Sequence, residues 1–154
     1  MIKNNYLLPL ILDLINSIGK KRVFTKIDLR WGYNNVRIKE GDEWKAAFLI
    51  SEGSFEPTVM FFGSTNSPAM FQTIMNDLLR DLVVEKNIAV FIDNVMIATE
   101  MEEGHDEIVE EVLRRLEEND LFVISEKCVW KVKEVRFLGV VIGEDGVRME
   151  KKKV

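Results

Sequence analysis

Two aspartates, each at the end of a short apolar run, are the residues of this sequence best placed to do chemistry. Asp93 follows the apolar run 88–92 and, with Asn94, separates it from a second apolar run at 95–98. Two runs rich in Val and Ile, joined by Asp and Asn, predict a tight β-hairpin, because these two residues tolerate a positive φ better than other non-glycine residues. Most such pairs serve only the turn, so a structural and a chemical role both stay open for Asp93.

The other aspartate, Asp28, ends the run RVFTKID at 22–28, which has the character of a strand. If this strand lies beside the hairpin that carries Asp93, both carboxylates meet at the same edge of a sheet. Two carboxylates a few Å apart bind divalent cations well, and a bound cation can position an attacking hydroxyl. The sequence therefore predicts a candidate metal site formed by Asp28 and Asp93.

Two long amphipathic helices are predicted on either side of the hairpin. The first begins at Ser67 and Pro68, a hydroxyl cap followed by proline at the first helical position, and its apolar stripe continues to Leu82. The second runs from His105 to about residue 116, after a possible capping box formed by Thr99 and the glutamate three residues later. His105 is the only histidine, and we expect it to be packed rather than catalytic.

The order of the central elements indicates the fold class. A strand, a long helix, two hairpin strands, a second long helix and a strand make a split βαβ, or ferredoxin-like, α+β unit with helices packed on one face of an antiparallel sheet. A short helix at 10–18 precedes this unit. Strand candidates at 36–39, 44–50 and 54–60 predict a small antiparallel meander within it.

Length and composition favour one globular domain spanning residues 1–154, because 154 residues with 47% hydrophobic content can build a core. The net charge of −5 opposes nonspecific binding to a polyanion, although basic residues cluster at 20–22 and 148–153 while acidic residues gather between 100 and 118. There is no apolar run of the roughly 20 residues that a membrane span needs, no signal peptide and a single cysteine. We expect a soluble intracellular protein, cytoplasmic or nuclear, without a membrane partner.

Five motifs, in order, carry a resemblance to a known family. They are FTKIDLRWGY at 24–33, EWKAAF at 43–48, VMFFGSTNSPAMFQ at 59–72, VFIDN at 90–94, and KCVW with VRFLGVVIGEDGV at 127–147. Together they resemble the reverse transcriptases of gypsy-class long-terminal-repeat retrotransposons, enzymes with a polymerase palm. The resemblance covers nearly the whole chain.

The resemblance implies nucleotidyl transfer by a two-metal mechanism with Mg²⁺ or Mn²⁺, acting on an RNA or DNA template-primer and a dNTP. It assigns Asp28 and Asp93 as metal ligands and Asn94 to a catalytic position. The positions it assigns to the incoming nucleotide are Tyr33, Phe62, Gly63 and Lys127, and those it assigns to primer support are Phe137, Leu138 and Gly139. For Tyr33, Phe62 and Phe137, packing in the core is an equally open alternative.

Several positions depart from the family pattern, and they are Trp31, Phe61, Ser64, Phe91 and Asn94. Asn94 removes one negative charge from the metal cluster, and an amide oxygen is a weaker ligand for a hard cation than a carboxylate. The fingers strands that grip the triphosphate, the thumb, the connection and the RNase H region are also expected to be missing. We therefore expect weak or no polymerase activity. A non-enzymatic assembly module that self-associates, or a minimal polymerase that needs Mn²⁺, are the alternatives.

Overall fold

The computed structural model describes residues 9–30, 32–61, 63, 66–85 and 87–151, without the side chain of residue 33. The helices are α1 (Ile11–Ile18), α2 (Ser67–Leu78), α3 (Arg80–Val84) and α4 (His105–Glu118), with short 3-10 helices η1 (Gly32–Asn35), η2 (Glu43–Ala46) and η3 (Ser125–Lys127). The strands are β1 (Val23–Asp28), β2 (Phe48–Ile50), β3 (Gly53–Phe55), β4 (Ile88–Phe91), β5 (Asn94–Thr99), β6 (Val129–Val132), β7 (Glu134–Phe137), β8 (Val140–Gly143) and β9 (Gly146–Met149). Of the helices in these ranges, none has the length and hydrophobicity that a membrane span requires.

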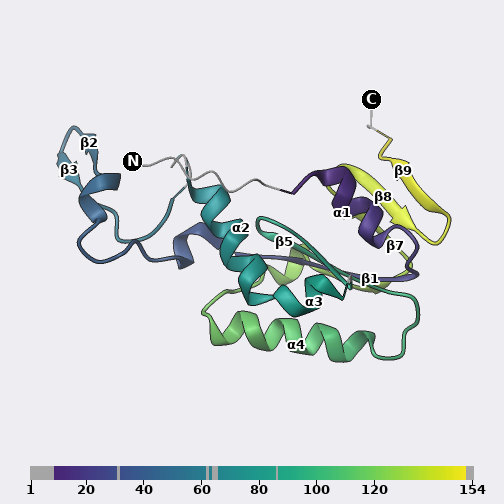
Figure 1. The fold of residues 1–154 in the computed structure, drawn as a ribbon. Helices are drawn as coiled ribbons and strands as arrows, with labels where there is room; N and C mark the ends of the chain where they lie inside the picture. The colour runs from purple at the N-terminus through teal and green to yellow at the C-terminus, as the bar shows by residue number, and fades with distance from the viewer. Residues whose placement is uncertain (1–8, 31, 62, 64–65, 86, 152–154) are drawn as a thin grey trace.

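The central sheet has the strand order β4-β5-β1-β6, and each neighbouring pair is antiparallel. Helices α2 and α3 connect β1 to the hairpin β4–β5, and α4 connects that hairpin to β6 (Figure 1). This is the order of a split βαβ unit, so the predicted α+β fold class is confirmed.

The two faces of the sheet bury different residues because side chains alternate along each strand. Ile27 of β1 and Ile97 of β5 pack with α2, α3 and α4. Phe24 of β1 and Met96 of β5 have the opposite parity along their strands and pack on the other face. The second face is covered by the small sheet β7-β8-β9 and by α1, whose buried side chains are Ile15 and Ile18. Helix α1 thus lies apart from the helices that follow it.

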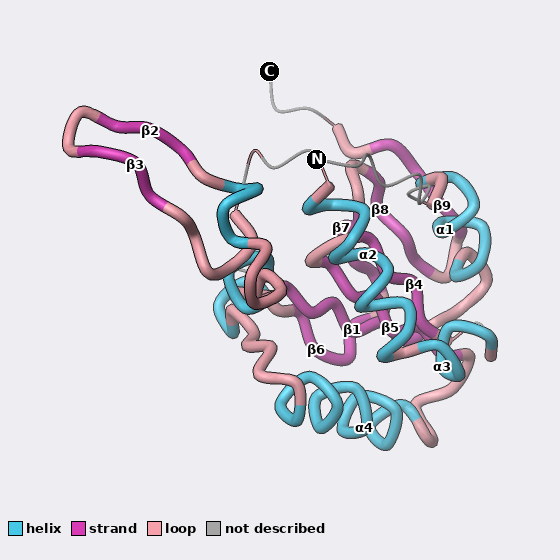
Figure 2. Tube along the Cα trace, turned by 60° about the vertical axis from the view of Figure 1, so that its left-hand side comes forward, coloured by secondary structure: helices cyan, strands magenta, loops and turns pink. Residues whose placement is uncertain are grey.

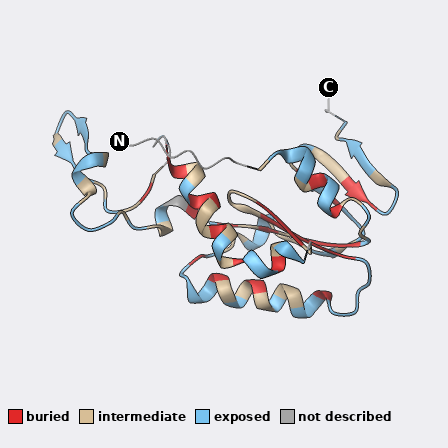
Figure 3. Ribbon diagram, in the orientation of Figure 1, coloured by how far each residue is buried: buried red, intermediate tan, exposed pale blue. Residues whose placement is uncertain are grey.

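The hairpin β2–β3, which we call the arm (residues 48–55), projects away from the rest of the molecule (Figures 1 and 2). All three residues of β2 are exposed, although they are apolar (Figure 3). The predicted meander is wrong, since residues 44–46 form η2 and a single bridge joins Arg37 to Val59. Two backbone hydrogen bonds, between Ile38 and Thr58 and between Met60 and Val36, join the segments on either side of that bridge, so they pair with each other and add no third strand.

One helix is divided where the prediction has it continuous, and one predicted capping box is absent. The helix expected to run from Ser67 to Leu82 is divided at Leu79, where φ is −112° and ψ is 17°. Thr99 does not form a capping box, because its hydroxyl donates to the carbonyl of Met101 and α4 begins after Gly104 at φ 78°. The buried stripe of α4 faces the sheet and its outer side is exposed (Figure 3).

Candidate active site

The hairpin between β4 and β5 places Asp93 at its tip. Phe91 pairs with Asn94, so the two turn residues are Ile92 and Asp93, one position earlier than predicted, and Asn94 is the first residue of β5. Ile92 has φ 54°, and among the described residues of this turn it alone has a positive φ. A positive φ at the first turn position is typical of a type II′ turn, but it is strained for a β-branched residue. Something must therefore hold this turn in place.

Gln72 of α2 makes the contacts that hold it. Its Oε1 accepts a hydrogen bond from the Ile92 amide at 2.7 Å, and its Nε2 donates to the Val90 carbonyl at 3.0 Å. The side chain is fully buried. The apolar pattern alone does not reveal this residue, although Gln72 shares a helix face with Met75 and Leu79, and a polar residue in such a stripe needs a polar partner.

The register of β1 and β5 brings the two aspartates to the same edge of the sheet. Asp28 pairs with Asn94, and the next amide, that of Leu29, donates to the carbonyl of Asp93 at 2.9 Å. On its other side, the Asp28 carbonyl accepts from the Ile124 amide at 2.8 Å. The Asp28 amide donates to Cys128 Sγ at 3.5 Å. The backbone of Asp28 is therefore fixed from both sides.

Charged groups of both signs lie near the two carboxylates. Burial raises the pKa of Asp93, and the negative charge of Asp28 raises it further, while the Asp93 backbone amide and Lys127 act in the opposite direction. Lys26 Nζ lies 3.7 Å from Asp28 Oδ2. Asn94 Nδ2 donates to Asp93 Oδ1 at 3.0 Å, so in this structure the amide orients the neighbouring carboxylate.

The donor set fits a hard divalent cation. Within the described residues, no group of three or more His, Cys, Asp or Glu side chains is gathered to hold a metal. Mg²⁺ is commonly held by one or two carboxylates, with water and substrate phosphates completing its coordination. Asp28 and Asp93 are the residues that would supply the protein oxygens.

The positions expected to contact the nucleotide are only partly described. Phe62 and the side chain of Tyr33 lie outside the described residues. The backbone of Tyr33 belongs to η1. This 3-10 helix lies close against α2: a Cβ added at Gly32 would come within 2.7 Å of the Phe71 ring. Gly63 is exposed at φ 96°. Lys127 is exposed in η3, and its charge reaches Asp93.

The positions expected to support a primer form the turn between β7 and β8. Phe137 is 2% exposed and belongs to the core on the second face of the sheet. Leu138 and Gly139, with φ 49° and 82°, are the two turn residues, and Leu138 packs against the same core. Asp28 shares the sheet face of Phe24 by alternation, so this turn and the Asp28 carboxylate lie on the same side of the central sheet.

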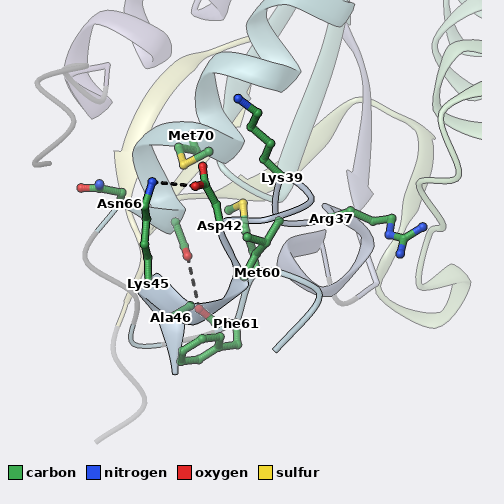
Figure 4. Close-up of a pocket in the computed structure, with 11 residues that line it drawn as sticks. Arg37, Lys39, Asp42, Lys45, Ala46, Met60, Phe61, Asn66 and Met70 are labelled. Atoms are coloured by element: carbon green, nitrogen blue, oxygen red, sulfur yellow. Dashed lines mark hydrogen bonds and ion pairs between the residues drawn. The ribbon is translucent and has the colours of Figure 1, made fainter. Parts of the chain in front are cut away.

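A cavity of ≈ 190 Å³ lies between the base of the arm and the start of α2 (Figure 4). Met60, Phe61 and Met70 form its apolar part, and neither Asp28 nor Asp93 lines it. Its basic residues are Arg37, Lys39 and Lys45, of which Lys45 is paired with Asp42 at 2.6 Å. Its lining residues Phe61 and Asn66 flank, in the sequence, the segment in which the family pattern expects a nucleotide contact.

Comparison with known proteins agrees with this architecture. Residues 2–142 match the family model of the reverse transcriptase (RNA-dependent DNA polymerase). The Tf2-7 and Tf2-3 transposon polyproteins of Schizosaccharomyces pombe are 37% and 36% identical to the chain over 143 residues, which are 93% of the chain and 11% of each polyprotein. The chain belongs to the reverse transcriptase family, and the predicted relation to retrotransposon polyproteins is confirmed.

Solved structures show the same fold. The foamy viral protease-reverse transcriptase in complex with an RNA/DNA hybrid matches with a TM-score of 0.87 at 26% identity, over 97% of this chain and 20% of that one. A second structure of that protein, with double-stranded DNA, matches with a TM-score of 0.88 over 97% of this chain and 26% of that one. This chain therefore spans a small part of the length of the proteins that it matches.

Proposed function

We propose that this chain is the palm portion of an RNA-directed DNA polymerase, in which Asp28 and Asp93 hold a divalent cation at the site of nucleotidyl transfer. One observation carries the proposal. The pairing of Asp28 with Asn94 puts two carboxylates, distant in sequence, at one edge of the sheet. A structural role for these residues does not explain why a half-buried Asp93 is kept beside a second negative charge that raises its pKa.

Each polar residue at this edge has a role in the proposed chemistry. A bound Mg²⁺ or Mn²⁺ would activate the primer 3′-hydroxyl and offset charge on the transferred phosphoryl group. Asp28 and Asp93 would fix the position of the cation, and Asn94 orients the Asp93 carboxylate. Lys127 adds a positive charge beside Asp93, where an anionic substrate would approach.

The proposed partners are a nucleic acid template-primer and a dNTP. Solved relatives hold an RNA/DNA hybrid or double-stranded DNA. The turn of Leu138 and Gly139 lies on the same side of the sheet as Asp28, which supports a primer end being held there. The residues proposed to contact the incoming nucleotide are Tyr33, Phe62 and Gly63.

We propose that the activity of this chain by itself is weak. Asn94 leaves the site one carboxylate short of the family pattern, and Lys26 already offsets part of the charge of Asp28. Grip on nucleic acid comes mainly from many phosphate contacts spread over a long track, which a chain of net charge −5 supplies poorly. We expect both the affinity for nucleic acid and the rate of nucleotide incorporation to be low.

Primer extension with Mg²⁺ and with Mn²⁺ tests the proposal. We expect slow incorporation that is lost in Asp28→Ala and increased in Asn94→Asp, since the added carboxylate strengthens the cation site. Incorporation that survives Asp28→Ala would contradict the proposed site. If no variant incorporates any nucleotide, including Asn94→Asp, polymerase activity of this chain is refuted.

A further inference from the structure

We infer that Gln72 is a positioning residue, which holds the strained hairpin turn so that Asp93 faces the same cation as Asp28. The inference rests on the proposed function, because it concerns the cation site defined there. Gln72 itself touches neither aspartate in the contacts of its amide, so its effect must pass through the turn.

The amide of Gln72 holds the β4 side of the hairpin at two points, the end of the strand and the first residue of the turn. Its oxygen takes the Ile92 N–H at 2.7 Å, and its nitrogen gives one hydrogen to the Val90 carbonyl and one to Asn76 Oδ1, each at 3.0 Å. Val90 is the last buried residue of β4 and Ile92 is the residue at φ 54°. A group that both accepts and donates is required, since one hairpin partner is an N–H and the other a C=O.

Loss of this clamp would act where the chain is strained. Without Gln72, the Ile92 N–H and the Val90 C=O lose their partner while the region stays largely buried, which is costly. The turn can then relax Ile92 toward a negative φ, because nothing else among the contacts of the described residues bonds its amide. Asp93 is the next residue, so its carboxylate would turn away from Asp28.

Helix α2 connects this clamp to the other side of the proposed site. The helix begins at Ser67, four positions after Gly63 in the sequence, and Gln72 lies between one and two turns further along. Phe71, the preceding residue, packs against Gly32 of η1. One helix therefore braces both the 3-10 helix that carries Tyr33 and the hairpin that carries Asp93.

The test uses the whole chain and Mn²⁺ alone, with binding followed by electron paramagnetic resonance. Gln72→Met keeps the shape but neither accepts nor donates as the amide does, and we expect it to weaken Mn²⁺ binding about tenfold, as the loss of a residue that orients a metal ligand typically does. Amide hydrogen exchange should become faster at Ile92. Thr73→Ala is the matched control, because Thr73 is the next residue of α2 and its hydroxyl bonds only to the Ala69 carbonyl of the same helix.

Gln72→Glu keeps the inference testable if Gln72→Met does not fold. Its carboxylate can accept from Ile92, but only the protonated form can also donate to Val90. The ratio of wild-type to Gln72→Glu affinity for Mn²⁺ should therefore be larger at pH 8 than at pH 5.5. A merely structural role would leave this ratio unchanged.

Equal Mn²⁺ affinity in folded Gln72→Met and wild type, or a ratio for Gln72→Glu that does not vary with pH, would overturn the inference. Wild type that binds no Mn²⁺ overturns it as well. Because no nucleic acid is present, a chain that binds Mn²⁺ in a Gln72-dependent way and yet incorporates no nucleotide would contradict the polymerase activity alone.

Discussion

Three features at Asp93 are unfavourable for the stability of the fold: its neighbour Ile92 is strained, its carboxylate is partly buried, and the carboxylate of Asp28 is nearby. Burial and Asp28 raise its pKa, which means that its ionised form is less stable in the folded chain than in the unfolded one. Such a residue reduces the stability of the fold at neutral pH.

Asp93→Asn should therefore stabilise the fold at pH 7, by about 0.5–1 kcal/mol, while removing cation binding. The sign follows from the raised pKa: the contribution to stability is fully present below the ordinary value of 3.8 and is lost as the pH rises through the folded value. The gain from the substitution should thus shrink as the pH is lowered toward 4. Urea unfolding at both pH values measures it, with Asp145→Asn in an exposed turn as the neutral control. Destabilisation at pH 7 would contradict this account of Asp93.

His105 is buried, as the sequence predicts, and its neighbours fix its tautomer. The Thr99 hydroxyl gives its proton to the Met101 carbonyl, so it must accept from His105 Nδ1 at 2.8 Å. In a neutral ring with its proton on Nδ1, Nε2 is an acceptor, so the Thr25 hydroxyl at 2.8 Å donates to it while accepting from the Lys131 amide. A neutral ring satisfies every group in this network.

Acid should destabilise the protein partly through His105. Burial lowers its pKa, with Lys131 acting in the same direction and Asp106 and Glu102 opposing. Stability from a lowered pKa is present above the ordinary value of 6.5 and is lost as the pH falls toward the folded value. We expect the free energy of unfolding to fall more between pH 7.5 and 5.5 in wild type than in His105→Gln. The variant should be about 1–3 kcal/mol less stable at pH 7.5, and parallel pH profiles would refute this role.

At this scale the sequence predicts the ends of strands better than the contacts of side chains. Asp28 and Asp93 are recognisable because each follows a strand-like run. The sequence places the turn one residue late, because the preference of Asp and Asn for a positive φ is local, whereas Ile92, which has the positive φ, is hydrogen-bonded by Gln72, 20 residues away. No spacing rule reports a hydrogen bond between a helix and a distant turn.

Among the elements, α3 and α4 are joined by one guanidinium. Arg115 of α4 donates to both oxygens of Asp81 at 2.6 and 2.7 Å, to the Leu78 carbonyl at 3.0 Å and to Glu111 at 2.7 Å. Its side chain is 20% exposed. Its neighbour Arg114 is 54% exposed and bonds only within α4, to Glu111 and Glu118.

Arg115→Met should cost about 1–2 kcal/mol of unfolding free energy, because the partly buried Leu78 carbonyl loses a charged donor and two helices lose their link. Arg114→Met should cost much less than Arg115→Met, since exposed ion pairs within a helix contribute little. Chemical denaturation of both variants provides the comparison. Equal losses would show that the contact between the helices has no special value.

The elements that the sequence predicts well are those that pack on the sheet. Helices α2 and α4 show a 3.6-residue apolar period because one face of each is buried. An apolar pattern does not predict a buried face in the arm, because its apolar residues Phe48, Leu49 and Ile50 are exposed. The break at Leu79 is also invisible in the pattern, since the apolar stripe continues across it.

At the scale of the whole molecule, the arm exposes several large apolar side chains to solvent. Leu49 is 82% exposed, and Trp44 at the base of the arm is 62% exposed. A two-stranded hairpin alone is only marginally stable in water, and exposed apolar groups of this kind commonly mark protein interfaces. The curated relatives are much longer than this chain, which covers 11% of their length.

We propose that the isolated chain self-associates through the arm at micromolar concentration. Sedimentation velocity should show a sedimentation coefficient that rises with concentration, and Leu49→Lys should abolish the rise without changing the free energy of unfolding of the monomer by more than about 0.5 kcal/mol. Met149→Lys, at an exposed apolar residue of β9, is the matched control. A monomer at every concentration, or association that Leu49→Lys leaves intact, would exclude the arm as the interface.

The place of the cation is the most direct test of the central claim. Crystals of the chain grown with Mn²⁺ should give an anomalous peak in contact with carboxylate oxygens of both Asp28 and Asp93, at the roughly 2.0–2.6 Å expected for hard divalent cations. A peak that touches only one of these carboxylates, or Mn²⁺ bound elsewhere while the two side chains point apart, would contradict the account.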